Sequence, residues 1–362
     1  MYKHGLVFGK FYPFHKGHEH LIRTAMEQSD HVTVVVCSLA NERIPGELRH
    51  AWVNQSVREM GAESEIKSKN TTVNVVHLDK TVPQEPSEHP DFWRIWTDLL
   101  EDYLEENDAP YDALFTSEDY GFPMAEHLGC QHVLVDKERA TYPISGTACR
   151  EELYVHSNAK NPHFTKGFKQ YVELETKPAE AYDHRIVIVG SESCGKSTMT
   201  HNLAKALNGV AVDEYGRTYT DEFTIESLAD FYVLLQTQLH DFLFTPKPEG
   251  KNSILISDTD AIVTQTFADL YFPLREKEFD LISDKHIRAY KDYADLYILL
   301  KPTVKWVDDG TREHETYREF AHGRIKSLLE KYEIPFVEIE DTDYDVRTAT
   351  ALEAVKDLMK KV

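Results

Sequence analysis

The chain has 362 residues, with 40 basic and 62 acidic side chains and a net charge of −22. This length favours two domains, and so acidic a surface argues against a general nucleic-acid-binding protein, because it repels a phosphate backbone. Hydrophobic residues make up 41% of the sequence, which excludes global disorder. No apolar run approaches the ~20 residues that cross a bilayer, no signal peptide is apparent, and the four cysteines form no CxxC pair. We therefore expect a cytoplasmic protein without membrane contact.

The predicted elements alternate between strands and helices, which indicates two α/β domains with mainly parallel sheets. Two buried strands, 6–8 and 186–189, each run into a glycine that precedes a predicted helix. Further β-rich runs occur at 31–37, 72–78, 113–116, 132–135, 253–256, 296–300 and 336–339, with helical patterns between them, for example at 91–106 and 311–332. The polar stretch 173–184 contains Pro178, so we expect it to link domains 1–172 and 185–362.

The first strand leads into the motif GKFYPFHKGH at residues 9–18, which suits a bound phosphate. His15 and His18 are three residues apart, so they share one face of a helical turn. Amides at the start of a helix together with two imidazoles form a donor cluster for an oxyanion. The residues also allow a zinc site completed by His20, or a merely polar helix start. The residues of this motif that could contact such a phosphate are Gly9, Lys10, Phe11, His15, Lys16 and His18.

A second segment, PISGTACR at residues 143–150, also directs donors at an anion. Ser145 and Thr147 can cap a helix whose first turn carries Arg150. Together the two segments resemble the signatures of the HxGH nucleotidylyltransferase superfamily, whose domain is Rossmann-like. The resemblance implies that a mononucleotide phosphate attacks the α-phosphate of ATP in line and that pyrophosphate leaves without a covalent enzyme intermediate. It assigns His15 and His18 to the ATP phosphates and Arg150 to the β/γ side. Further ATP contacts are implied for Gly9, Lys10, Phe11, Lys16, Ser145 and Thr147.

Three intermediate segments look like nicotinamide-nucleotide adenylyltransferases: NERIPGELR at 41–49, FTSEDYG at 115–121 and VDKER at 135–139. This resemblance implies that Arg43 and Arg49 contact the mononucleotide substrate. It also implies that a tryptophan near residue 96 stacks on the nicotinamide ring, for which Trp96 fits better than Trp93. The attraction between a cationic pyridinium and an indole face supports such a role. Packing of both tryptophans in the core is the alternative.

The second glycine-rich turn, GSESCGKST at 190–198, matches the P-loop pattern G-x-x-x-x-G-K-[ST] between a strand and a helix. Lys196 would reach the β- and γ-phosphates of ATP, and Ser197 would bind Mg²⁺. Cys194 stands near a helix start, so we expect a lowered pKa and sensitivity to thiol alkylation. The expected ATP contacts of this loop are Gly190, Ser191, Glu192, Ser193, Cys194, Gly195, Ser197 and Thr198, beside Lys196.

Acidic residues follow two later strands. Asp258 is the expected Mg²⁺ carboxylate, with Asp260 as the alternative, and either Asp213 or Glu214 could accept the proton of an attacking hydroxyl.

A basic segment follows the strand at 296–300. Arg312 is expected to close over the transferring phosphate as a lid, with Arg318 and Arg324 as further candidates.

These segments resemble the ribosylnicotinamide kinase domain of NadR-type proteins, through GSESCGKS, EYGR at 214–217, DTD at 258–260 and WVDDGTR at 306–312. The resemblance then covers nearly the whole chain, and the family is bifunctional: a kinase makes nicotinamide mononucleotide (NMN) from nicotinamide riboside, and an adenylyltransferase makes NAD from NMN. The implied ligands are ATP, nicotinamide riboside, NMN, NAD and Mg²⁺. The implied riboside contacts come from Tyr215, Arg217, Asp258, Asp260 and Trp306.

Other interpretations stay open. The same two folds could act on another nucleoside and mononucleotide, or one site could bind nucleotide without turnover in a sensing regulator. The first motif begins within ten residues of Met1, so we expect no N-terminal DNA-binding repressor domain and no nucleic-acid partner. Assembly into homo-oligomers is compatible with the sequence.

Overall fold

The computed structural model describes residues 1–39, 42–63, 66, 69–104, 109–153, 159–176, 182–272, 286–306 and 317–360. The chain divides into two compact units, Met1–Glu175 and Thr176–Val362, and each is described by itself. The division falls inside the stretch predicted as a linker. Among the helices of the described ranges, none is long and apolar enough to cross a membrane.

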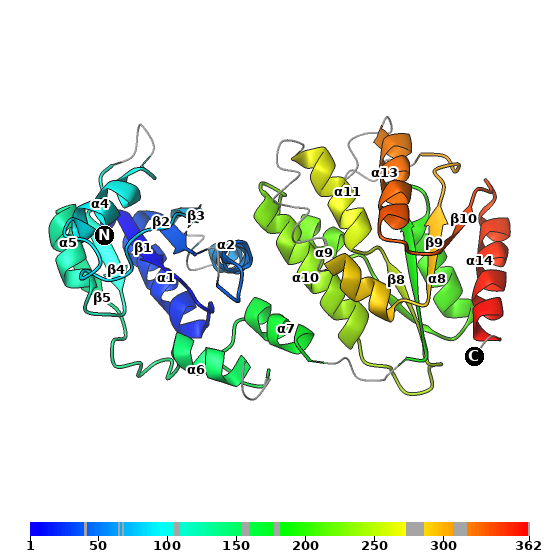
Figure 1. The fold of residues 1–362 in the computed structure, drawn as a ribbon, viewed down its shortest axis with the longest axis horizontal. Helices are drawn as coiled ribbons and strands as arrows, with labels where there is room; N and C mark the ends of the chain where they lie inside the picture. The colour runs from blue at the N-terminus through cyan, green and yellow to red at the C-terminus, as the bar shows by residue number, and fades with distance from the viewer. Residues whose placement is uncertain are drawn as a thin grey trace. The chain divides into compact units, whose positions relative to one another are not determined.

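The N-terminal unit is built on a parallel five-stranded sheet with the order β3-β2-β1-β4-β5 (Figure 1). Its strands are β1 (Tyr2–Gly9), β2 (Ser29–Cys37), β3 (Thr72–Leu78), β4 (Ala113–Thr116) and β5 (Gln131–Leu134). Its helices are α1 (Lys16–Gln28), α2 (Gly46–Ala62), α4 (Phe92–Glu101), α5 (Gly121–Leu128), α6 (Gly146–Glu151) and α7 (Lys166–Leu174). The strand order reverses between β1 and β4, and the carboxyl ends of strands at such a point are where open α/β sheets bind ligands.

The C-terminal unit has a second parallel five-stranded sheet, with the order β10-β9-β6-β8-β7. Its strands are β6 (His184–Gly190), β7 (Val210–Val212), β8 (Ile254–Asp258), β9 (Leu296–Leu300) and β10 (Phe336–Ile339). Its helices are α8 (Lys196–Ala206), α9 (Tyr215–Glu222), α10 (Leu228–Phe244), α11 (Ala261–Tyr271), α13 (Arg318–Lys331) and α14 (Tyr344–Met359). The central strand β6 is buried along its whole length, because helices cover both faces of the sheet (Figure 1).

The predicted strands all occur, within two residues at nearly every end, because buried parallel strands are continuous apolar runs that the sequence displays directly. The helix predicted at 91–106 is α4, which begins at Phe92 and ends at Glu101. The helix predicted at 311–332 is α13, which begins at Arg318, and residues 307–316 lie outside the described part. Two α/β domains with parallel sheets are therefore confirmed.

Candidate active sites

The histidine pair of the N-terminal unit lies where β1 leads into α1. The rings of His15 and His18 stack with centroids 3.7 Å apart and planes 16° apart. Burial, with the nearby Arg139 charge, lowers the pKa of His15 to about 4, and burial with the charge of His15 holds the pKa of His18 well below its usual value. Both imidazoles are therefore neutral near pH 7. Nδ1 of His15 is buried and has no hydrogen-bond partner among the described residues.

Metal binding by this pair was the alternative left open by the sequence. In the part of the chain that the structure describes, no group of three or more His, Cys, Asp or Glu side chains has an arrangement suited to a metal ion. The third histidine of the motif, His20, instead places its ring 5.5 Å from that of Tyr142.

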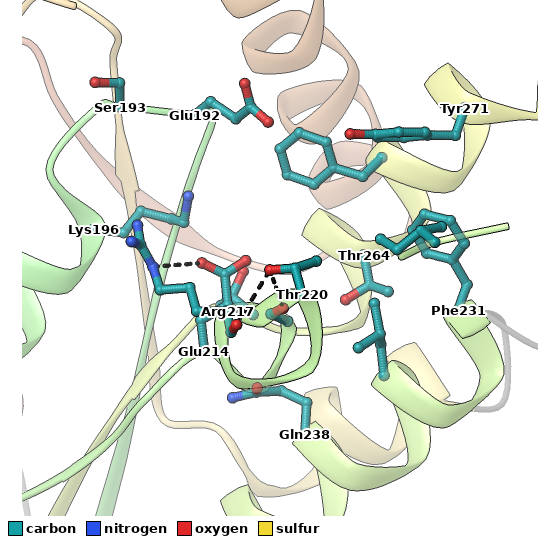
Figure 2. A pocket seen from close by; sticks show the side chains of 15 residues that line it. Glu192, Ser193, Lys196, Glu214, Arg217, Thr220, Phe231, Gln238, Thr264 and Tyr271 are labelled. Carbon is teal, nitrogen blue, oxygen red and sulfur yellow. Dashed lines mark hydrogen bonds and ion pairs between the residues drawn. The ribbon is translucent and has the colours of Figure 1, made fainter. Parts of the chain in front are cut away.

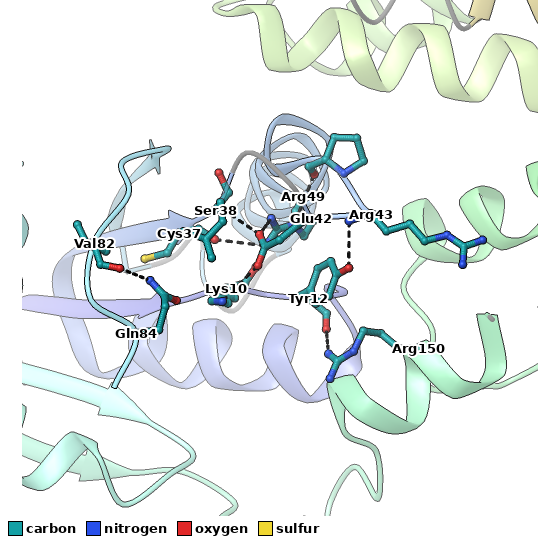
Figure 3. Close-up of polar contacts among 12 residues, drawn as sticks. Lys10, Tyr12, Cys37, Ser38, Glu42, Arg43, Arg49, Val82, Gln84 and Arg150 are labelled. Atoms are coloured by element: carbon teal, nitrogen blue, oxygen red, sulfur yellow. Dashed lines mark hydrogen bonds and ion pairs between the residues drawn. The ribbon is translucent and has the colours of Figure 1, made fainter. Parts of the chain in front are cut away.

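The same site contains a cation, Arg150, whose hydrogen-bond partners are uncharged (Figure 3). It lies on α6, whose N-cap Ser145 accepts a hydrogen bond from the amide of Ala148. One guanidinium nitrogen of Arg150 donates to the carbonyl of Tyr12 at 2.5 Å, and another donates to the hydroxyl of Thr147 at 3.0 Å. No ion pair of Arg150 occurs among the described residues, so its positive charge is available to an anion.

Arg49 is a buried cation of the same unit. Its side chain is fully buried, and its guanidinium pairs with Glu42 at 2.5 Å and donates to the carbonyls of Lys10 and Cys37. Glu42 also pairs with Lys10 at 3.3 Å. This side chain therefore fastens the loop after β2 to the loop after β1, and its contact with substrate stays a prediction.

Two other predicted cations of this unit lie near carboxylates. The guanidinium of the exposed Arg43 is 4.0 Å from the Glu175 carboxylate, and the ammonium of Lys16 pairs with the Glu19 carboxylate at 2.5 Å.

Trp96 is only 8% exposed and lies in the core, with its ring 5.8 Å from that of Phe8 and its indole N–H donating to the carbonyl of Pro83 at 2.9 Å. The packing alternative thus describes most of this side chain, and stacking on a nicotinamide ring stays a prediction.

In the C-terminal unit, the P-loop connects β6 to α8. An added Cβ at Gly190 would lie 2.6 Å from Sγ of Cys194 and 2.8 Å from the carbonyl of Leu300, so only glycine fits there. Gly195 has a φ of +91°, which also favours glycine. Lys196 follows it, is buried, and donates from Nζ to the carbonyl of Ser191 at 3.2 Å. The loop has the shape expected of a phosphate cradle.

Two carboxylates face Lys196. Although burial opposes it, the charges of Glu214 and Asp258 raise the pKa of Lys196. Burial and the charge of Glu214 raise the pKa of Asp258 to about 6. Both carboxylate oxygens of Asp258 are buried without a hydrogen-bond partner among the described residues, and the side chain of Ser197 lies beside them. Such an unsatisfied carboxylate next to a hydroxyl is a suitable oxygen donor set for a divalent cation.

A pocket opens beside these charges (Figure 2). Its polar end carries Lys196, Glu214 and Arg217, and the Arg217 Nε lies 3.6 Å from the Glu214 carboxylate. Its apolar end is lined by Phe231 of α10 and by Phe267 and Tyr271 of α11. These aromatic residues could not be predicted from the sequence, because an aromatic side chain on a helix that lines a pocket follows the same pattern as one in the core.

The other acids predicted for this site lie outside the pocket. Asp213 is 72% exposed and pairs with His201 at 3.0 Å. Asp260 is fully buried at the N-cap of α11, where it accepts hydrogen bonds from two backbone amides and from the hydroxyl of Tyr297. Both carboxylate oxygens of Asp260 thus accept hydrogen bonds within the fold, and its contact with substrate stays a prediction. The backbone amide of Tyr215 donates to Gln238 at 2.7 Å.

Of the predicted lid arginines, Arg312 lies outside the described residues. Arg318 donates to the P-loop carbonyls of Glu192 and Ser193, both at 3.2 Å, and its guanidinium lies 5.7 Å from the ring centre of Trp306. Arg324 pairs with Asp269 at 2.7 Å. Arg318 therefore supports the backbone of the P-loop, a role that was not predicted from the sequence.

The burial of Cys194 contradicts the prediction that its thiol has a lowered pKa and reacts readily with alkylating agents. The side chain is 1% exposed and packs in the core of the unit, and burial raises its pKa. We expect iodoacetamide at pH 8 to leave Cys194 largely unmodified in the native protein and to label it fully after denaturation, as measured by peptide mass spectrometry. Cys130, which is partly exposed, is the internal control and should react first. Rapid labelling of Cys194 without unfolding would contradict its burial.

The chain was compared with known proteins. Residues 6–152 match the cytidylyltransferase-like family and residues 185–347 match the AAA domain family. The trifunctional NAD biosynthesis/regulator protein NadR of Escherichia coli (strain K12) is 29% identical over 379 residues, which cover 98% of this chain and 83% of that protein.

Among solved structures, a NadR protein in complex with NAD and AMP-PNP is 22% identical, with a TM-score of 0.40, and the match covers 99% of this chain and 96% of that one. A NadR protein in complex with NR is also 22% identical, with a TM-score of 0.41 and the same coverage.

Each of the two family matches covers one of the two sheets, and the similarity to the E. coli protein spans both. Each part also carries polar donors where the central strand of its sheet ends, His15, His18 and Arg150 in one and Lys196 in the other. The chain is therefore a NadR-like protein, in which a cytidylyltransferase-like nucleotidyltransferase domain precedes a P-loop kinase domain of the AAA type.

Proposed function

We propose that this protein is a bifunctional enzyme of NAD salvage. Its C-terminal unit phosphorylates nicotinamide riboside with ATP to give NMN, and its N-terminal unit transfers AMP from a second ATP to NMN, which gives NAD and pyrophosphate. One observation carries the proposal: each of the two parallel sheets has polar donors suited to a phosphate where its central strand ends, in a chain that matches a protein of NAD biosynthesis over 98% of its length.

In the kinase unit, the P-loop amides and Lys196 hold the β- and γ-phosphates of ATP. Mg²⁺ fits here, because the buried oxygens of Asp258 lack hydrogen-bond partners among the described residues and the Ser197 side chain lies beside them. When bound, Mg²⁺ neutralises charge on the transferred phosphate. Glu214 accepts the proton of the riboside 5′-hydroxyl while that oxygen bonds to the γ-phosphorus and ADP leaves.

The aromatic end of the kinase pocket suits the pyridine ring of the riboside. Nicotinamide riboside carries a positive charge on that ring, and a cation over an aromatic face is stabilised by the ring quadrupole. Phe231, Phe267 and Tyr271 supply such faces at one end of the pocket, and Glu214 supplies a carboxylate at the other. Riboside contacts from Tyr215 and Trp306 are part of the same proposal.

In the adenylyltransferase unit, a phosphate oxygen of NMN bonds to the α-phosphorus of ATP, and the bond to the β-phosphate breaks. Because His15 and His18 are neutral near pH 7, each can donate one N–H to the triphosphate without repelling the other. Arg150 meets the charge that develops on the leaving pyrophosphate. Positioning and charge stabilisation perform the catalysis, without a covalent enzyme intermediate.

The kinase base is tested by two matched substitutions. We expect Glu214→Gln to lower kcat for riboside phosphorylation by about 100-fold or more, because general-base catalysis contributes on that scale. Asp213→Asn, one residue away in the chain, should stay within about threefold of wild type, because its carboxylate is exposed and pairs with His201. Steady-state kinetics with nicotinamide riboside checks both, and a larger loss in Asp213→Asn would reverse the assignment.

The whole proposal is tested by incubating the protein with nicotinamide riboside, ATP and Mg²⁺ and identifying the products by chromatography. NAD is the expected product, with NMN as the intermediate. NMN alone would limit the chain to kinase activity. If neither NAD nor NMN formed, the proposal would be overturned, and the protein would act on another nucleoside or have a binding function.

A further inference from the structure

Tyr12 lies in the loop between β1 and α1 and joins two parts of the N-terminal site (Figure 3). Its hydroxyl accepts a hydrogen bond from the backbone amide of Arg43 at 3.2 Å, and its carbonyl accepts one from the Arg150 guanidinium at 2.5 Å. The guanidinium carbons of Arg49 and Arg150 lie 5.0 Å and 5.1 Å from the centre of its ring. One side chain therefore contacts the loop after β2 and the arginine on α6.

The two arginines beside this ring have different surroundings. Arg49 is fully buried and its charge is paired with Glu42. Arg150 is half-buried, and the contacts that the structure gives it are to Tyr12 and Thr147, which are uncharged. Holding a long side chain in one orientation costs rotamer entropy, so the placement of Arg150 depends on the groups that it packs against.

The approach of α6 to Tyr12 is also close. A Cβ added at Gly146 would lie 2.8 Å from the carbonyl of Tyr12 and 3.2 Å from a guanidinium nitrogen of Arg150. The glycine at the start of α6 thus leaves the space through which Arg150 reaches Tyr12.

We propose that Tyr12 is a positioning residue for adenylyl transfer: its ring holds the guanidinium of Arg150 in the orientation that meets the leaving phosphates of ATP. The inference rests on the adenylyltransferase activity proposed above. A cation–π contact of this kind corresponds to roughly a fivefold effect on binding. The hydrogen bond from Arg150 to the Tyr12 carbonyl does not involve the Tyr12 side chain, so substitutions of that side chain leave its acceptor in place.

Two variants separate the ring from the hydroxyl. NAD formation is measured with NMN supplied and nicotinamide riboside omitted, so that only adenylyl transfer is observed. We expect Tyr12→Leu to lower kcat/KM for ATP roughly fivefold, and Tyr12→Phe, which keeps the aromatic face, to stay within about twofold. Thermal unfolding checks that each variant folds. Tyr12→Met, a second side chain without a ring, replaces Tyr12→Leu if the leucine variant is unstable.

A double-mutant cycle tests whether the ring acts through Arg150. In an Arg150→Ala background, Tyr12→Leu is expected to cause no further loss, because the guanidinium that the ring positions is gone. Losses that multiply would overturn the positioning role, since a purely structural effect of Tyr12 persists without Arg150. Equal losses in Tyr12→Phe and Tyr12→Leu would overturn it as well. A wild-type protein that makes no NAD from NMN would instead overturn the proposed function.

Discussion

Replacing Lys196 by alanine is expected to lower kcat for nicotinamide riboside phosphorylation by at least about 100-fold, because a preorganised cation at the transferred phosphate contributes on the order of 3 kcal/mol. The Lys196 ammonium is buried, faces Glu214 and Asp258, and lies at the base of the P-loop. NAD formation from supplied NMN should stay within about twofold, because that reaction uses the other unit. Product formation by chromatography measures both activities in one protein preparation.

Lys205→Ala is the matched control for this prediction. Lys205 lies on the same helix α8, is exposed, and should affect neither activity, since exposed substitutions away from a site have small effects. A similar loss in Lys205→Ala would mean that the helix rather than the ammonium is damaged. Loss of both activities in Lys196→Ala would contradict two independent sites.

His18→Ala should have the converse effect. We expect kcat for NAD formation from NMN to fall about 100- to 1,000-fold, which is the scale for the loss of one donor to a developing negative charge. The substitution also removes the ring on which His15 stacks, so part of the loss reflects a misplaced His15. Riboside phosphorylation to NMN should be unchanged, and the ratio of the two products in the coupled assay reports this directly.

The control for His18→Ala is His20→Ala on the same helix α1. His20 contacts the ring of Tyr142, so its removal should change NAD formation by less than about threefold. Equal losses in the two variants would favour a shared structural or metal-binding role for the histidines over direct donation to ATP. Retained NAD formation in His18→Ala would remove His18 from the mechanism.

The fold of this protein was largely predictable because its signals are local. The strands β1 and β6 carry apolar runs and end in glycine, and the helices α1 and α8 are the next elements along the chain. Gly190 and Lys196 could be identified because the conformation that a phosphate requires is specified by neighbours in the chain. Arg150 was predicted in the same way, from the capping residues around it.

The errors and omissions have one origin, which is that side-chain direction depends on residues distant in the chain. Asp213 and Glu214 are equivalent in the sequence, and only the packing of α9 turns Glu214 toward Lys196. The burial of Arg49 against Glu42 was not predicted from the sequence. Cys194 stands at a helix start, but the core around it raises rather than lowers its pKa.

The sequence alone therefore determined the class of chemistry, because glycine turns, helix starts and the donors attached to them are encoded within about ten consecutive residues. The tertiary structure decided which donors point into each site. It joined Tyr12 to Arg150 across 138 positions of the chain and Arg318 to Ser193 across 125. It also brought Phe231 and Tyr271 to one pocket. Contacts over such separations arise from the packing of whole helices and sheets, so no short motif records them.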